Sequence, residues 1–91
     1  MKKVNWGIIG LGKIANIFAE AFKYSVYGQL TGISSTKKEN ILKFKDQYKL
    51  NKDFCFNSYE ELLRSKDIDI VYIALPNSLH YEWILKCINY K

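Results

Sequence analysis

Residues 4–15, VNWGIIGLGKIA, decide the fold of this 91-residue chain. The stretch begins as an apolar run that is too short and too closely bounded by glycine for a helix of its own, which predicts a buried parallel strand. It ends in Gly10-x-Gly12-x-x-Ala15, the spacing of a dinucleotide-binding turn. Because this turn follows a strand and opens an amphipathic helix, we predict cofactor binding there. An ordinary glycine turn between a strand and a helix is the alternative.

Each small residue of the turn has a physical role. Gly10 can adopt the backbone angles of a tight turn, and Gly12 lets a pyrophosphate approach the main chain. Ala15 lets the new helix lie close to the strand. The helix begins with free N–H groups and a partial positive charge, which suit a phosphate. We therefore expect Gly10, Gly12, Lys13 and Ile14 to contact a bound dinucleotide.

The rest of the chain alternates between strands and helices. Apolar residues at helical spacing predict a helix over about 13–24, with Gly28 as a breaker after it. Further strands are expected at 29–34, 54–56 and 68–75, and further helices from about 36, 58 and 77. Such alternation implies parallel strands joined by right-handed crossovers. We predict an α/β fold over residues 1–91, an incomplete Rossmann-like doubly wound sheet with strand order 3-2-1-4.

Three helix starts carry capping signals. Residues 36–39 (TKKE) and 58–61 (SYEE) have the spacing of a capping box, in which side chains bond to the free N–H groups of a helix start. Asn77 or Ser78 is expected to cap the last helix.

The carboxyl ends of the first and fourth predicted strands meet where the strand order reverses, and ligands bind at that point in such sheets. We expect Gly10–Ile14 to lie beside Leu75, Pro76 and Asn77. His80, the single histidine, follows in the first turn of the last helix. It is either a partly buried helix residue or a contact to cofactor or substrate. It is not assigned as a proton donor, because no second ionisable group is visible to partner it.

The composition excludes several classes of function. The net charge is +5, but the lysines are dispersed and no nucleic-acid module accompanies them, so we expect no nucleic-acid partner. No apolar run approaches the length of a membrane span, and the first residues make a poor signal peptide. Cys55 and Cys87 have no metal-binding spacing. We expect no metal, no membrane partner and a cytoplasmic location.

Three segments resemble a known family: 6–15 (WGIIGLGKIA), 59–63 (YEELL) and 68–80 (IDIVYIALPNSLH). They are similar to the N-terminal half-domain of the glucose–fructose oxidoreductase/inositol dehydrogenase/MocA family, over nearly the whole chain. The strand ending in LPNxxH is the most specific of them. The resemblance implies NAD(P)-dependent hydride transfer at a hydroxyl-bearing carbon of a sugar, cyclitol or similar molecule. It also implies that the LPNxxH segment lines the cofactor crevice and favours His80 as a site residue.

The resemblance places the catalytic lysine in a Glu-Lys-Pro motif beyond Lys91, together with the substrate-binding domain. This chain is then the nucleotide-binding part of a longer enzyme, with no catalytic residue assigned, and is expected to be inactive alone. The alternative is a non-catalytic dinucleotide-sensing or interaction module with the same half-fold. In either case the fourth strand lacks an outer neighbour, and we expect self-association through that edge.

The segment after the second strand concerns the choice of cofactor. In NAD-specific sites a carboxylate there binds the ribose hydroxyls. The family resemblance puts that position on Ser35, where many NADP-using members also have serine. A hydroxyl can donate to a 2′-phosphate, and Lys37 and Lys38 can add charged contacts. Thr36 stands where the family often has arginine. We predict that NADP is preferred, with NAD as the alternative, through contacts of Ser35, Thr36 and Lys37. The other interpretation is that Ser35 and Thr36 only cap a helix.

Overall fold

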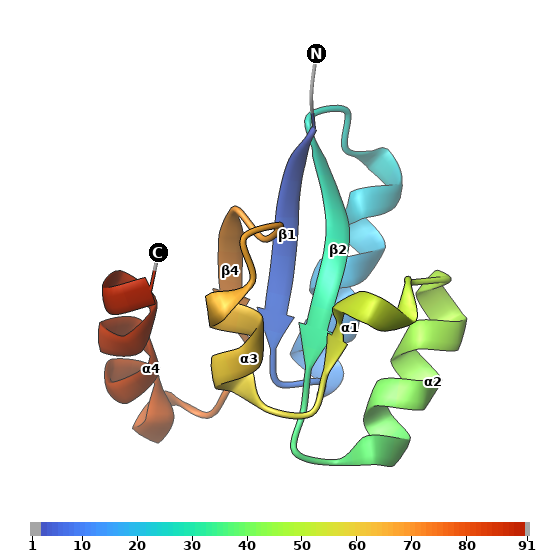
Figure 1. Ribbon diagram of the computed structural model, residues 1–91. Helices are drawn as coiled ribbons and strands as arrows, with labels where there is room; N and C mark the ends of the chain where they lie inside the picture. The colour runs from blue at the N-terminus through green and yellow to red at the C-terminus, as the bar shows by residue number, and fades with distance from the viewer. Residues whose placement is uncertain (1–2, 91) are drawn as a thin grey trace.

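The computed structural model describes residues 3–90, apart from the side chain of Asn77. The strands are β1 (Val4–Ile9), β2 (Gly28–Ser34), β3 (Cys55–Phe56) and β4 (Ile70–Ile73). The helices are α1 (Lys13–Ala21), α2 (Lys38–Tyr48), α3 (Tyr59–Arg64) and α4 (Asn77–Tyr90), with 3₁₀ turns η1 (Phe22–Tyr24) and η2 (Lys52–Phe54). All strand pairs are parallel, and the order β3-β2-β1-β4 confirms the predicted Rossmann-like α/β sheet (Figure 1).

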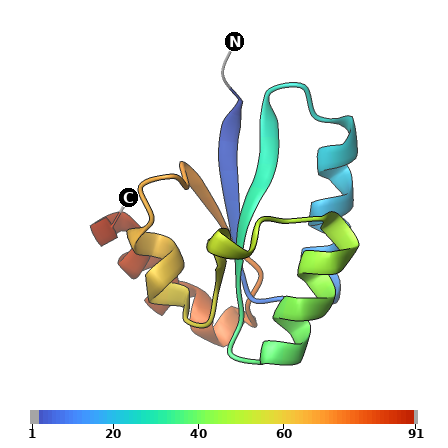
Figure 2. The ribbon, with the colours of Figure 1, turned by 45° about the vertical axis from the view of Figure 1, so that its right-hand side comes forward.

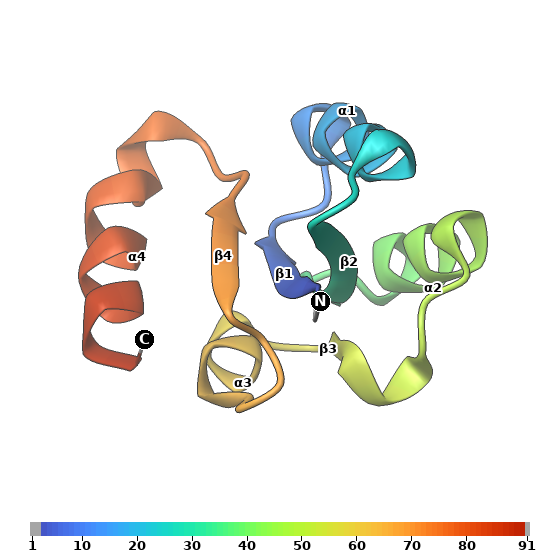
Figure 3. The same ribbon diagram turned by 90° about the horizontal axis from the view of Figure 1, so that it is seen from above.

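The sheet is the middle of three layers. Helices α1 and α2 lie on one face, and α3 and α4 lie on the other (Figure 3). Ile8 and Ile9 are neighbours in β1, both fully buried, and they pack into different cores. Ile8 contacts the side of α1 and α2, whereas Ile9 contacts Leu62 and Leu63 of α3. This explains why β1 reads as a continuous apolar run: both of its faces are covered.

Several of the predicted elements have different bounds. The helix predicted over 13–24 ends at Ala21, and its last turn tightens into η1. Gly28, predicted to be the breaker after this helix, is instead the first residue of β2. A Cβ there would lie 2.9 Å from the Trp6 indole nitrogen, so the close approach of β1 requires glycine.

The fourth strand is shorter than the predicted 68–75. β4 pairs only with β1, and the register runs from Trp6–Ile70 to Ile9–Ile73. Beyond it, the backbone N–H of Ala74 still donates to the Ile9 carbonyl at 2.8 Å. The length of the pairing with β1 therefore limits the strand. Within residues 3–90 no strand lies on the outer side of β4.

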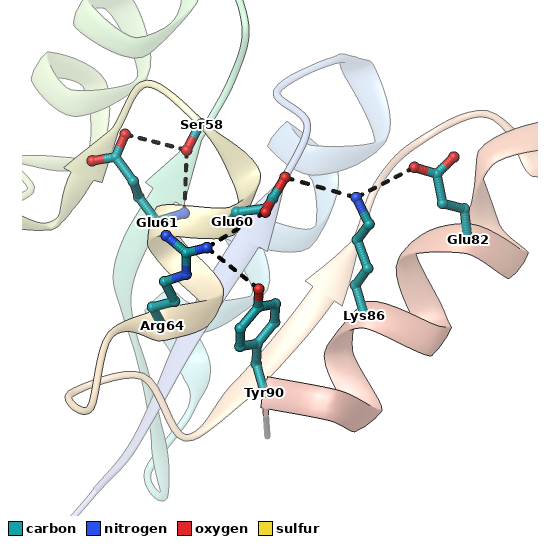
Figure 4. Close-up of polar contacts among 7 residues, drawn as sticks. All are labelled: Ser58, Glu60, Glu61, Arg64, Glu82, Lys86 and Tyr90. Carbon is teal, nitrogen blue, oxygen red and sulfur yellow. Dashed lines mark hydrogen bonds and ion pairs between the residues drawn. The ribbon is translucent and has the colours of Figure 1, made fainter.

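Of the two predicted capping boxes, the one at Ser58 forms its N-cap bond, and the one at Thr36 is wrong. The Ser58 hydroxyl accepts from the backbone N–H of Glu61 at 3.2 Å and donates to its carboxylate at 3.2 Å (Figure 4). In α2, by contrast, Lys37 is the N-cap and makes no side-chain capping bond. The Ser35 hydroxyl accepts from the Lys37 N–H at 3.1 Å. This local turn takes the place of a Thr36 cap.

The cap of the last helix differs as well. α4 is already helical at Asn77, so Ser78 lies inside the first turn and cannot be the N-cap. The predicted capping role of the Asn77 side chain lies outside the described residues. No helix in the described part of the chain has the length and apolarity needed to cross a membrane.

Candidate functional site

The turn after β1 joins the ends of three strands. The Gly10 N–H donates to the carbonyl of Ser34 at the end of β2, at 3.0 Å. Gly10 has φ +89°, a left-handed conformation. A Cβ on Gly10 would lie 2.8 Å from the Ala74 carbonyl oxygen and 2.8 Å from Leu75 Cδ2. Gly10 is therefore required by the fold itself, because it lets the β1 turn contact the chain that leaves β4.

Gly12 has no comparable structural constraint. Its φ of −101° is open to any residue, and a Cβ there would meet nothing within 4 Å. Gly12 is the N-cap of α1, with no side-chain capping bond and no acidic residue in the first turn. The start of α1 therefore has neither a side-chain cap nor a side chain at Gly12 to shield it, and the helix dipole is positive there. This is the cradle that a dinucleotide pyrophosphate requires.

A cavity of about 440 Å³ lies between this turn and the end of β4. Gly12, Lys13 and Ile14 form one wall of the cavity, which we call the turn wall. The other wall, the β4–α4 wall, consists of Tyr72, Ile73, Ala74, Leu75, Pro76 and His80. The sequence prediction that the glycine turn lies beside Leu75 and Pro76 is therefore confirmed.

His80 lies in the first turn of α4, half-buried, and lines the cavity. The preceding turn is held by the backbone N–H of Leu79, which donates to the Pro76 carbonyl at 2.9 Å. Pro76 itself is exposed. The positions of Pro76 and His80 thus depend on where α4 begins and on how α4 packs against the rest of the fold.

The segment after β2 lies at the same edge of the sheet as the β1 turn (Figure 2) but is built differently. Ser35 is buried, and its backbone N–H donates to the Phe56 carbonyl at 3.4 Å. Thr36 and Lys37 are exposed. Ser35, Thr36 and Lys37 are not among the described residues that line the 440 Å³ cavity.

Sequence reasoning missed three lining residues, Tyr72, Ile73 and Ala74. Tyr72 stacks on Phe18 of α1 with centroids 3.9 Å apart and planes 12° apart. The sequence does contain a signal for Tyr72 and Ala74, because alternate residues of an extended chain lie on the same face of a sheet. Tyr72 and Ala74 pack toward the α1 core, while Val71 and Leu75 pack toward α3.

The cavity holds three ionisable side chains and, within the described residues, no carboxylate. Lys13, Tyr72 and His80 are its ionisable side chains among the described lining residues. Over residues 3–90, no three His, Cys, Asp or Glu side chains gather to hold a metal ion. Burial raises the pKa of the Cys55 thiol, which favours a packing role over a reactive one.

Comparison with known proteins agrees with this geometry. A family model described as "Oxidoreductase family, NAD-binding Rossmann fold" matches residues 4–91. The trans-1,2-dihydrobenzene-1,2-diol dehydrogenase of Xenopus tropicalis is 32% identical over 86 residues, 92% of this chain and 26% of that protein. The myo-inositol 2-dehydrogenase of Thermotoga maritima is 28% identical over 85 residues, 93% of this chain and 25% of that protein.

Solved structures share the fold. A 3-ketoreductase from Actinomadura kijaniata, solved with NADP and TDP-benzene, has a TM-score of 0.87 and 28% identity. The match covers 98% of this chain and 27% of that one. The chain thus spans about a quarter of the length of these relatives.

Proposed function

Because this chain belongs to the glucose–fructose oxidoreductase/inositol dehydrogenase/MocA family of oxidoreductases with an NAD-binding Rossmann fold, we propose that it is the nucleotide-binding part of a dehydrogenase. Its substrate would be a sugar, cyclitol or similar small molecule, oxidised or reduced at a hydroxyl-bearing carbon. The names of the relatives, a diol dehydrogenase, an inositol dehydrogenase and a ketoreductase, support this class of substrate.

One observation carries the proposal: the open space at Gly12. Nothing in the fold requires a glycine there, since the backbone angles are ordinary and a Cβ would meet no atom within 4 Å. The missing side chain leaves the uncapped start of α1 accessible from the cavity. A pyrophosphate needs this combination of close backbone approach and free N–H donors.

In this proposal, different residues of the chain bind different parts of the cofactor. The N–H groups at the start of α1 hold the pyrophosphate, and exposed Lys13 adds a positive charge. Pro76 and His80 form the opposite wall and orient the nicotinamide side of the cofactor. When bound, NAD(P) supplies or accepts the hydride. We assign no residue of this chain a catalytic role.

We also propose that NADP is preferred over NAD. The family resemblance puts Ser35 where an NAD-specific site has a carboxylate, and the NADP complex of the related ketoreductase supports this choice. The Ser35 oxygen already accepts from Lys37 N–H but can still donate to a phosphate. Because Lys37 and Lys38 are exposed, the preference would be modest and would weaken with salt.

A dinucleotide-sensing module is the second candidate. The described lining of the cavity favours it in one respect, because it holds no carboxylate to pair with His80. The two candidates share the same cofactor site, so binding alone does not separate them. Reproducible turnover of NAD(P) with a panel of polyols by the isolated chain would contradict our assignment of an inactive nucleotide-binding part.

The direct test is a fluorescence titration of the chain with NADPH and NADH, with duplex DNA as a control ligand. We expect both dinucleotides to bind, NADPH more tightly, and DNA not to bind. If neither dinucleotide binds, the proposed function is wrong.

The unpaired edge of β4 leads to a proposal about assembly. Strand β4 pairs with β1 on one side, and the described residues supply no strand for its other side. Ile70 in this edge strand is 40% exposed. Such an edge is a template for pairing with another chain. We expect light scattering to show assembly that increases with protein concentration, and a stable monomer at high concentration would contradict this.

A further inference from the structure

We propose that an ionic clamp between α3 and α4 positions the β4–α4 wall and so tunes cofactor affinity. The clamp consists of Glu60 and Arg64 on α3 and Lys86 and Tyr90 on α4 (Figure 4). The inference rests on the proposed function, because its effect is seen through binding of the dinucleotide.

Helix α4 is weakly anchored by apolar packing. Each of the other three helices contributes two fully or nearly fully buried residues to a core. No described side chain of α4 is buried to that degree. Trp83 and Cys87 pack partly against the α3 core, while Ile84, Leu85 and Ile88 remain 45–69% exposed. The position of α4 must therefore depend more on polar contacts than that of the other helices.

Glu60 is the centre of these contacts. Its two carboxylate oxygens lie 3.7 Å from Arg64 Nη2 and 3.7 Å from Lys86 Nζ. The Arg64 guanidinium donates to the Tyr90 hydroxyl at 3.4 Å. Lys86 Nζ also lies 4.3 Å from the centroid of the Trp83 ring, which meets Tyr59 edge-on at 5.1 Å. A single exposed ion pair stabilises little, but several linked charges beside an aromatic ring stabilise more.

The clamp acts on the cavity through the helix. His80 lies in the first turn of α4, about 9 Å along the axis from Lys86. If α4 undocks from α3, the wall formed by Pro76 and His80 moves with it. A cofactor that binds only the docked form loses affinity in proportion to the undocked fraction. Conversely, the bound cofactor favours the docked form.

Glu82 offers a matched control within the same helix. Its carboxylate lies 3.5 Å from Lys86 Nζ, but the pair is internal to α4 and does not reach α3. Glu60→Gln and Glu82→Gln each remove one negative charge beside the same lysine. The added net positive charge favours the anionic cofactor in both variants. Only Glu60→Gln removes an ion pair between the two helices, that of Glu60 with Lys86, and leaves the Arg64–Tyr90 hydrogen bond in place.

The experiment is an NADPH titration of the wild-type chain and both variants, with hydrogen exchange of the backbone amides. We expect Glu60→Gln to weaken NADPH binding, by no more than about threefold, and Glu82→Gln to leave it unchanged or slightly stronger. Exchange in α4 should be faster in Glu60→Gln than in wild type, with α2 unaffected. A general loss of stability would instead accelerate both helices.

A second pair of variants tests the charge itself. Lys86→Met should weaken NADPH binding as Glu60→Gln does, and Lys86→Arg should retain it. If wild type binds NADPH and Glu60→Gln binds equally well, the clamp inference is overturned while the proposed function stands. If wild type binds neither dinucleotide, the proposed function fails and the inference fails with it.

Discussion

The ends of β1 and β2 lie side by side at one edge of the sheet but are built in opposite ways. After β1, Gly12 leaves the start of α1 open and uncapped. After β2, Ser35 is buried, and its hydroxyl already accepts a bond from the Lys37 N–H. At the end of β1 the helix start has no side-chain cap, whereas at the end of β2 the serine hydroxyl is already bonded to the local backbone. The proposed pyrophosphate site therefore rests on the geometry of a turn, while the proposed preference for NADP rests on Ser35 and the exposed lysines after it.

The largest expected effect is at Gly10, which makes the β1 end possible. Gly10→Ala forces an L-residue into a left-handed conformation and places a Cβ 2.8 Å from the Ala74 carbonyl oxygen. We expect the free energy of unfolding to fall by about 3 kcal/mol, measured by urea denaturation. Gly12→Ala is the control, because its Cβ meets open space. Equal losses in the two variants would contradict the distinction drawn between these glycines.

Gly12→Val tests the β1 end as a ligand site without disturbing the fold. The branched side chain would occupy the space through which the pyrophosphate approaches. We expect affinity for NADPH to drop at least tenfold, about 1.4 kcal/mol, with an unchanged circular dichroism spectrum. If the affinity is unchanged and the fold intact, the glycines serve only the backbone, and the two strand ends do not differ in the way described.

The smallest expected effect is at the β2 end. In Ser35→Asp the carboxylate would repel a 2′-phosphate and accept bonds from the ribose hydroxyls of NAD. We expect the modest preference for NADP to reverse, measured as the ratio of the two dissociation constants at low and high salt. Ser35→Ala should reduce the preference without reversing it. Tighter binding of NAD than of NADP by wild type at both salt concentrations would show that the serine is only part of a turn.

Much of the fold was predictable because its signals are local. The apolar run before Gly10 identified β1, and the Ser58 capping box correctly marked the start of α3. The Thr36 box has equally good spacing, but the Ser35 hydroxyl bonds to the Lys37 N–H instead. Both Ser35 and Thr36 can bond to nearby backbone N–H groups, and residue spacing alone does not show which of the two hydroxyls does so.

The sequence by itself determined the alternation of strands and helices and hence the strand order, because apolar periodicity and turn signals are properties of neighbouring residues. The family followed from the resemblance of three segments, 6–15, 59–63 and 68–80, which the family model over residues 4–91 bears out. The tertiary structure alone showed why the two glycines differ: a Cβ on Gly10 would meet Ala74, just after β4 and more than 60 residues along the chain, whereas a Cβ on Gly12 would meet nothing. It also placed Tyr72 in the cavity and Lys86 beside Glu60. These contacts join segments distant in the chain, and their geometry exists only when the sheet and its two helical layers are packed together.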